Sequence, residues 1–182
     1  MTREAKITDA AITTLAAEGM RGLTHRAVDR RAGLPEGSTS YYFRTRSALL
    51  TATVQRLAEL DADEIPAPVS DLGDLASSLA ASLVKWTTAD RDRQLARYEL
   101  TLEATRRAEL RDALVRGGDT IRAMVAELLR AAGVPAPADR AHLLVACIDG
   151  LLFDQITGTG GGDPDVGDVA SNIRQIVAAI SA

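Results

Sequence analysis

Residues 24–50 read THRAVDRRAGLPEGSTSYYFRTRSALL, and this stretch predicts two short helices joined by a turn. The first is expected over 24–32, and Gly33 can end it because glycine readily adopts the left-handed conformation that follows a helix. Pro35 suits a first helical position, so the second is expected over 35–43. Two short helices around a glycine-containing turn indicate a helix-turn-helix.

Longer helices are expected on both sides of this stretch. Apolar residues recur at i, i+4 and i+8 in the helix predicted over 3–18, and Gly19 can end that helix. Thr45 is a suitable cap for a helix that continues to about residue 60, because its hydroxyl can accept a bond from a free amide.

The remainder of the chain is predicted to be helical as well. Residues 61–70 hold two prolines and three acidic residues and indicate a connector. No segment alternates apolar and polar residues for long enough to form a strand, and aromatic residues make up only 3% of the chain. We therefore expect an all-α fold of about nine helices, the later ones running from Asp71 to about 86, over 91–106 and 108–132, over 139–157, and from Pro164 after a Gly158–Gly162 linker.

The charge is divided unevenly along the 182 residues. The net charge is −4, yet residues 1–56 hold nine Lys and Arg against five Asp and Glu, a net of +4. Residues 57–182 hold twelve against twenty, a net of −8. A basic N-terminal part on an acidic body would fit a helix-turn-helix that binds double-stranded DNA; the alternative is chance in a small number of charges.

The composition excludes several classes of protein. Cys147 is the single cysteine, so no internal disulfide and no cysteine-based zinc site is expected, and His25 and His142 lie far apart. No run of about 18 apolar residues predicts a membrane span, and the polar N-terminus favours the cytoplasm. No catalytic or metal-binding motif is present, so neither an enzyme nor a cofactor is expected.

Polar and basic residues lie where the predicted second helix would meet DNA. Ser38, Thr39, Ser40 and Tyr41 could reach base edges, whereas arginines flanking the motif could neutralise phosphates. The alternative is an ordinary helical corner with a solvated charged rim. The DNA-binding residues that we predict are Thr24, Arg26, Ser38, Thr39, Ser40, Tyr41, Tyr42, Arg44 and Arg46.

The segment AGLPEGSTSYYF, residues 32–43, resembles the DNA-binding head of the TetR/AcrR family of transcription regulators. That family's signature has a small residue, Gly, an apolar residue and a second Gly, followed by three aromatic residues and Phe, with a basic residue soon after. Arg46 stands in the basic position here. Ser40 replaces the first tyrosine, so the contact of that hydroxyl is either lost or taken over by Tyr41.

The resemblance implies a dimeric repressor that a small-molecule effector releases from a pseudo-palindromic operator. Residues 1–46 would form the DNA-binding domain, and residues 47–182 would form the effector-binding and dimerisation domain. Two rival functions remain open at this point: an all-α ligand-binding protein or enzyme without a DNA role, and a DNA-binding regulator without a small-molecule ligand.

Two further groups of residues follow from the predicted helices of the body. The few aromatic residues there could line an effector cavity, although core packing is the simpler explanation; the ligand-binding set is Trp86, Tyr98, Met124, Asp149 and Phe153. Two strongly apolar helices could pair with their copies in a homodimer. Their predicted interface residues are Leu144, Ile148, Leu151, Leu152, Val169, Ile173, Ile176, Val177 and Ile180.

Overall fold

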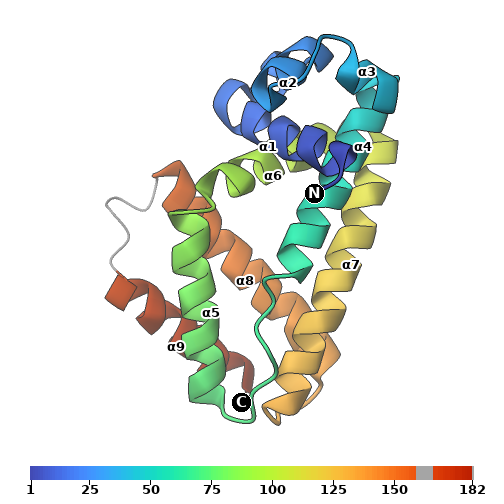
Figure 1. Ribbon diagram of the computed structural model, residues 1–182. Helices are drawn as coiled ribbons and strands as arrows, with labels where there is room; N and C mark the ends of the chain where they lie inside the picture. Colours follow the sequence, from blue (N-terminus) through green and yellow to red (C-terminus); the bar gives the residue numbers. More distant parts are fainter. Residues whose placement is uncertain (159–165, 182) are drawn as a thin grey trace. The chain divides into compact units, whose positions relative to one another are not determined.

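The structure, a computed structural model, describes residues 1–158 and 166–181, which form helices joined by turns and connectors (Figure 1). No strand occurs in these residues, which confirms the predicted all-α class. The helices are α1 (Arg3–Gly22), α2 (His25–Ala32), α3 (Ser38–Tyr42), α4 (Arg46–Ala62), α5 (Leu72–Thr87), α6 (Arg91–Ala104), α7 (Ala108–Ala131), α8 (Pro137–Thr157) and α9 (Val166–Ser181). The predicted linker after Gly158 and the helix start at Pro164 lie outside the described residues.

The chain forms two compact units, each built from two segments. The first comprises Met1–Asp61 and Asp92–Gly118, and the second comprises Ala62–Arg91 and Asp119–Ala182. The predicted division after residue 46 therefore does not coincide with a boundary between compact units, because α4, most of α6 and the start of α7 belong with the N-terminal helices.

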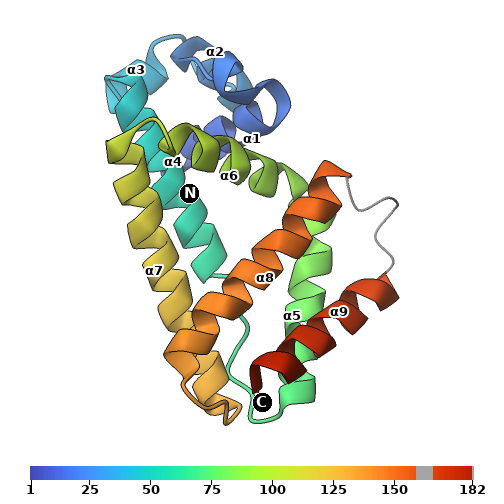
Figure 2. The same cartoon turned by 180° about the vertical axis from the view of Figure 1, so that it is seen from behind.

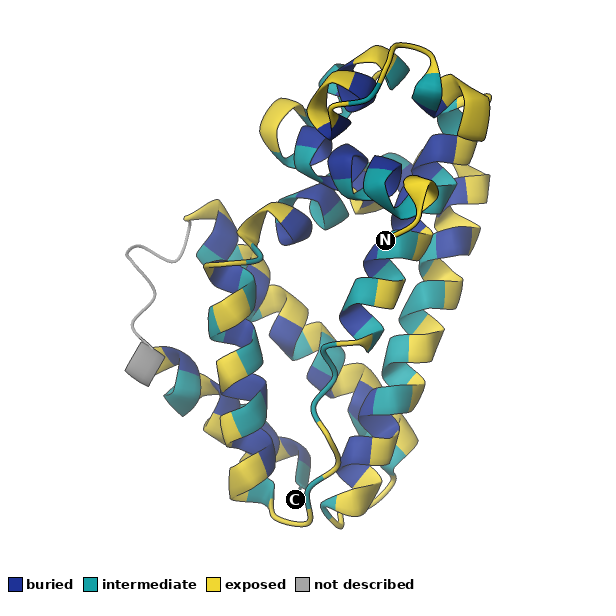
Figure 3. Ribbon diagram, viewed as in Figure 1, coloured by how far each residue is buried: buried dark blue, intermediate teal, exposed yellow. Residues whose placement is uncertain are grey.

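The core of the first unit joins the N-terminal helices to α4, α6 and α7. Ile7 and Leu15 of α1, Val28 of α2 and Leu100 of α6 are each 0% exposed within one hydrophobic cluster. Figure 3 shows these helices with their buried residues, in dark blue, on the sides that face one another. Burial of a large aliphatic side chain contributes about 1.5–3 kcal/mol, so this cluster is the main source of the unit's stability.

Glycines mark two places where backbone geometry decides the packing. Gly19 has φ +65° and ψ −174°, so α1 breaks at the predicted residue but continues for another short turn. A Cβ at Gly117 would lie 3.2 Å from the Cβ of Ala58, so the glycine permits close packing of α7 on α4. The break that the Gly117-Gly118 pair could have produced does not occur, because α7 is one helix across it.

In the second unit, α9 packs against α5 and α8 (Figure 2). This packing corrects the predicted dimer interface, because Leu144, Ile148, Leu152, Val169, Ile173, Val177 and Ile180 are all buried within the protomer. Leu151 and Ile176 are half-buried. An apolar stripe shows that a helix has a partner but does not identify it, and here much of the stripe on α9 is covered by α5.

No described helix combines the length and the apolar character that a membrane span requires.

Candidate nucleic-acid interface

The helix-turn-helix forms largely from local signals in residues 24–42. The Thr24 hydroxyl accepts a bond of 3.1 Å from the Ala27 amide, which caps α2. Gly33 adopts the left-handed conformation with φ +60°, and its amide donates to the Arg30 carbonyl over 3.2 Å. The predicted start of the second helix is wrong, because Pro35 lies in the turn and α3 begins only at Ser38.

Asp29 holds the start of α3 in place. Its Oδ2 accepts from the Gly37 amide over 2.8 Å, and its Oδ1 accepts from the Thr39 amide and hydroxyl over 2.7 and 2.6 Å. Asp29 itself is 1% exposed. Bonds to a carboxylate are stronger than neutral ones, and here they satisfy amides that a helix start leaves free. Since α3 has only five residues and cannot persist alone, Asp29 determines where it lies.

This arrangement corrects the role predicted for Thr39. The side chain is 0% exposed and its hydroxyl donates to Asp29, so it cannot reach a base edge. Ser38 is half-buried, and its hydroxyl donates to the Pro35 carbonyl over 2.7 Å. Both residues thus position the recognition helix from its inner side.

The outer side of α3 presents the residues that remain available to DNA. Ser40 is exposed, Tyr41 is 79% exposed and Tyr42 is 39% exposed. The two tyrosine rings meet edge to face, with centroids 5.2 Å apart and planes at 78°. Most of the α3 ribbon is accordingly yellow in Figure 3. Aromatic rings in this arrangement limit each other's rotamers, so the Tyr41 hydroxyl projects from a restrained ring.

The three arginines assigned to phosphates have different surroundings. Arg44 is exposed. Arg26 forms an ion pair of 2.9 Å with Glu36, and both side chains are more than 70% exposed, so the pair is weak and can exchange for a phosphate. Arg46 is the exception. Its guanidinium donates to the carbonyls of Leu23 and Met20, so it serves the end of α1 and is not available as predicted.

Several contacts that position the head were not predicted from the sequence. The His25 Nε2 lies 2.7 Å from the Phe43 carbonyl and joins the two ends of the motif. Glu99 of α6 accepts from the Met20 amide over 3.1 Å, just after the break in α1. In the sequence, only Asp29 signalled a positioning role. It is an acidic residue directly after Val28 on the side of α2 that faces the core, where a charged side chain needs partners.

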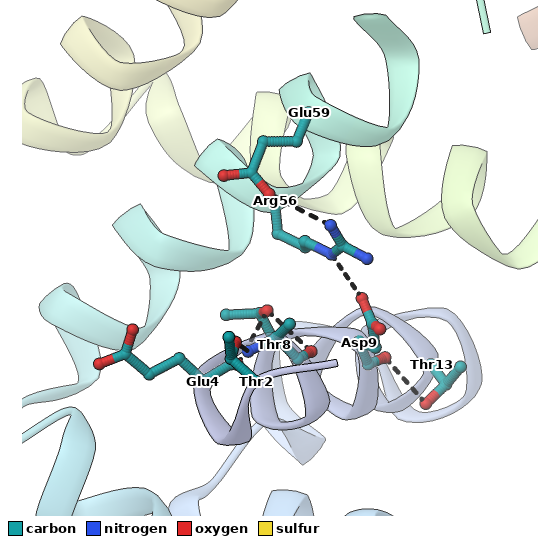
Figure 4. Close-up of polar contacts among 8 residues, drawn as sticks. Thr2, Glu4, Thr8, Asp9, Thr13, Arg56 and Glu59 are labelled. Atoms are coloured by element: carbon teal, nitrogen blue, oxygen red, sulfur yellow. Dashed lines mark hydrogen bonds and ion pairs between the residues drawn. The ribbon is translucent and has the colours of Figure 1, made fainter. Parts of the chain in front are cut away.

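A polar bridge also ties α1 to α4 (Figure 4). Arg56 Nε lies 2.8 Å from Asp9 Oδ1, and Arg56 Nη1 lies 3.1 Å from Glu59 Oε2. The hydrogen bond to Asp9 raises the pKa of Arg56, against a smaller opposing effect of desolvation. The helix that directly follows the recognition motif is therefore held against α1 by charge as well as by the apolar core.

The predicted effector residues are divided between the two compact units. Tyr98 belongs to the first unit and is half-buried, whereas the others belong to the second. Trp86 and Met124 are half-buried, and the Trp86 Nε1 donates to Glu64 over 2.7 Å. Asp149 and Phe153 are exposed on α8, and their assignment to an effector cavity stays a prediction. Among the described residues, no group of three or more His, Cys, Asp or Glu side chains could hold a metal ion.

Comparison with known proteins matches both parts of the chain. Residues 7–53 match the family model of bacterial regulatory proteins, tetR family, and residues 70–181 match the Tetracyclin repressor-like, C-terminal domain. A TetR-family member from Streptomyces coelicolor A3 has a similar structure, with a TM-score of 0.77 and 30% identity over 100% of this chain and 99% of its own. No curated protein matches the chain.

Two further solved structures are similar over nearly the whole chain. The multidrug binding protein EbrR complexed with ethidium has a TM-score of 0.72 and 30% identity, covering 96% of this chain and 98% of its own. A transcriptional regulator from Rhodococcus sp. Rha1 has a TM-score of 0.79 over 98% of this chain and 96% of its own. At 22% identity, the latter shows the shared fold alone.

Proposed function

Because this chain belongs to the TetR family of DNA-binding transcriptional regulators, which are not enzymes, we propose that it is a repressor released from its operator by a small-molecule effector. The observation that carries the proposal is the helix-turn-helix of α2 and α3. There Asp29 fixes α3, and Ser40 and Tyr41 remain exposed. A helix-turn-helix needs such a fixed helix, because base edges are read only by side chains held in register with the major groove.

The proposed contacts divide into two classes. Ser40, Tyr41 and Tyr42 meet base edges and select the sequence, whereas Arg26 and Arg44 meet phosphates and set the affinity. Thr24 keeps a backbone role, since its hydroxyl already caps α2. We place the protein in the cytoplasm, where the bacterial chromosome lies.

A homodimer is the second part of the proposal, and it uses a different face of α8 from the one predicted. Leu143, Ala146, Gly150 and Phe153 recur at i, i+3, i+7 and i+10 and are all exposed, Leu143 to 45% and Phe153 to 47%. A Cβ at Gly150 would meet nothing within 4 Å, so another backbone can approach closely there. An exposed apolar stripe of this kind supports pairing with a second copy around a two-fold axis.

The dimer is tested by sedimentation at micromolar concentration. We expect Phe153→Asp to yield a folded monomer, because it places a charge on the proposed interface without disturbing the core. Leu102→Asp is the matched control, since Leu102 is an exposed apolar residue of α6, 61% exposed. A wild-type chain that sediments as a monomer, or equal behaviour of the two variants, contradicts the interface.

The effector part of the proposal draws support from EbrR, which was crystallised with ethidium. Release is a population shift: the effector must favour the form of the protein that does not fit the operator, by roughly several kcal/mol for near-complete release. Melting of the protein alone with ethidium tests whether this chain also takes that compound. The DNA is left out because ethidium itself binds DNA.

The central experiment selects an operator from random double-stranded DNA and measures affinity over a salt series. We expect Arg44→Ala to weaken binding and to reduce the log–log salt slope by about 0.9, because one phosphate contact is lost. Arg174→Ala is the control, since it removes an exposed arginine of α9, far along the chain from the motif. If no sequence is enriched, or if both variants weaken binding equally, the DNA-binding assignment of this surface is wrong.

A further inference from the structure

Residues 20–23 form a short joint between the long first helix and the helix-turn-helix. Gly19 breaks α1 directly before the joint, with φ +65° and ψ −174°. Thr24 caps α2 directly after it. The last residue of the joint, Leu23, is 0% exposed in the core of the first unit. The place of the joint therefore decides where the helix-turn-helix begins.

A side chain of α6 holds the first residue of this joint. A break in a helix interrupts the bonds between amides and carbonyls four residues apart, so the groups beside it need other partners. Glu99 Oε2 accepts from the Met20 amide over 3.1 Å. A Cβ at Gly19 would lie 3.6 Å from Glu99 Oε1, so the carboxylate lies against the break itself. A bond to a carboxylate is stronger than a neutral one, and it joins α6 to the start of the joint.

A side chain of α4 holds the carbonyls of the same joint. Arg46 is half-buried, and its guanidinium donates from Nη2 to the Met20 carbonyl and from Nη1 to the Leu23 carbonyl. The planar guanidinium can serve two acceptors in one fixed arrangement. Met20 is thus bonded through its amide to α6 and through its carbonyl to α4.

The helix-turn-helix follows the joint without a flexible segment between them. Thr24 caps α2, and Asp29 of α2 fixes α3, so a displacement of the joint is passed on to the recognition helix. In the proposed dimer, the two recognition helices must reach half-sites about 34 Å apart. One added base pair lengthens that distance by about 3.4 Å and turns one half-site around the DNA axis. A firmly held joint therefore restricts the dimer to one spacing.

We propose that Glu99 and Arg46 are positioning residues for operator recognition, and that they set the spacing of half-sites that the protein accepts. Neither side chain needs to touch DNA for this role. The choice of bases within a half-site stays with Ser40 and Tyr41. The role rests on the proposed function, because a spacing has meaning only for a dimer on a two-part operator.

The bond at the joint is tested on the whole protein without DNA, by amide hydrogen exchange measured by NMR. Glu99→Ala and Glu99→Gln remove the same charge, but glutamine keeps an oxygen acceptor. We expect exchange at Met20, relative to the buried core residue Leu15, to be about tenfold faster in Glu99→Ala and close to wild type in Glu99→Gln. Unchanged relative exchange at Met20 in Glu99→Ala overturns the proposal.

The positioning role is tested on DNA that carries the selected half-sites at several spacings. We expect the wild type to prefer one spacing about tenfold over a spacing changed by one base pair. Glu99→Ala should reduce this preference about threefold or more, and Glu99→Gln should keep most of it. Base preferences within a half-site should stay the same in all three proteins. Equal weakening at every spacing would show a merely structural role and overturn the proposal.

Arg46→Lys gives a second, independent variant, and it carries the test if Glu99→Ala does not fold. It keeps the positive charge but replaces the planar guanidinium by a single ammonium group. We expect the same loss of spacing preference, whereas a phosphate contact would depend mainly on the retained charge. An unchanged spacing preference in Arg46→Lys contradicts the role of the clamp.

Failure of this role and failure of the proposed function give different results. If no operator is enriched, or if the wild type sediments as a monomer, the positioning role falls together with the function on which it rests. If an operator is enriched and the dimer forms, but the variants keep the wild-type spacing preference, the proposed function stands and the positioning role alone is refuted.

Discussion

Two buried polar clusters of the first unit differ in how completely their atoms are paired. Around Asp29, one carboxylate takes three bonds from Gly37 and Thr39, and none of these atoms is left without a partner. Around Gln94, a fully buried amide has no partner at all. A saturated cluster rigidifies its surroundings, whereas an unsaturated one keeps bonding capacity for something else. The first is suited to holding a recognition helix still, whereas the second leaves a buried amide without bonds to lose.

The largest effect is expected from breaking the saturated cluster. Asp29→Ala leaves two backbone amides at the start of α3 without an acceptor, and we expect a loss of about 3 kcal/mol or more in the free energy of unfolding. Operator binding should be lost as well, since Asp29 accepts the bonds of the Gly37 and Thr39 amides that fix the start of α3. Urea denaturation measures the first and anisotropy the second. Asp112→Ala, which removes an exposed acidic residue of α7, should change neither.

A pair of shape-conserving substitutions sharpens the comparison. Thr39→Val removes one bonded hydroxyl and should cost about 1–2 kcal/mol, because Asp29 loses a donor in a buried site. Gln94→Leu should cost nothing or stabilise the protein, because it removes atoms that have no bonds to lose. Equal losses in the two urea titrations would show that the clusters do not differ in the way the geometry indicates.

Local signals account for most of what was predicted in the head. Thr24 and Gly33 act on helix ends within three residues, and both were predicted from the sequence and confirmed. The start of α3 was missed because its cap is Asp29, eight residues before Gly37 and on another helix. Pro35 is a residue that often begins a helix, and it predicted the start on local grounds. The start of α3 is instead decided by the tertiary contact with Asp29, which local sequence patterns do not contain.

The errors in the functional residues have a similar cause. Arg46 was assigned to DNA and Ile173 to a dimer interface, and both assignments suit the chemistry of the residue type. Arg46 instead caps the carbonyl end of α1, and Ile173 is 0% exposed in the second unit. Sequence shows that a cation needs acceptors and that an apolar stripe needs cover, but not which segment supplies them. Gln94 carried no signal, because its significance lies in bonds that are missing.

A smaller effect is expected at the bridge between α1 and α4. Arg56→Met keeps much of the apolar stem and removes the ion pair with Asp9, and we expect a loss of about 0.5–1 kcal/mol for this partly exposed pair. Added salt should diminish the difference between wild type and variant. Urea titrations at low and high salt measure both. A salt-independent loss would indicate packing and not charge as the source.

The smallest effect concerns an ion pair at the end of α6, between Glu103 and Arg107, which lies just after the helix. The hydrogen bond from Arg107 lowers the pKa of Glu103 below its ordinary range, so the charged form is favoured in the folded state. Its contribution is present above the unfolded pKa of about 4.3 and is lost as the pH falls through the folded pKa. For an i, i+4 surface pair we expect a few tenths of a kcal/mol. Urea titrations of wild type and Glu103→Gln should converge in this acidic range.

The division of labour within α3 has a practical consequence for engineering. Its placement depends on Asp29, Gly37 and Thr39, all of which face inward or lie in the turn. Its outward positions, Ser40 and Tyr41, take no part in that placement. A combinatorial library at these two positions should therefore change which operator is chosen without altering expression or melting behaviour. The residues that select the operator are thus different from the residues that hold the helix in register.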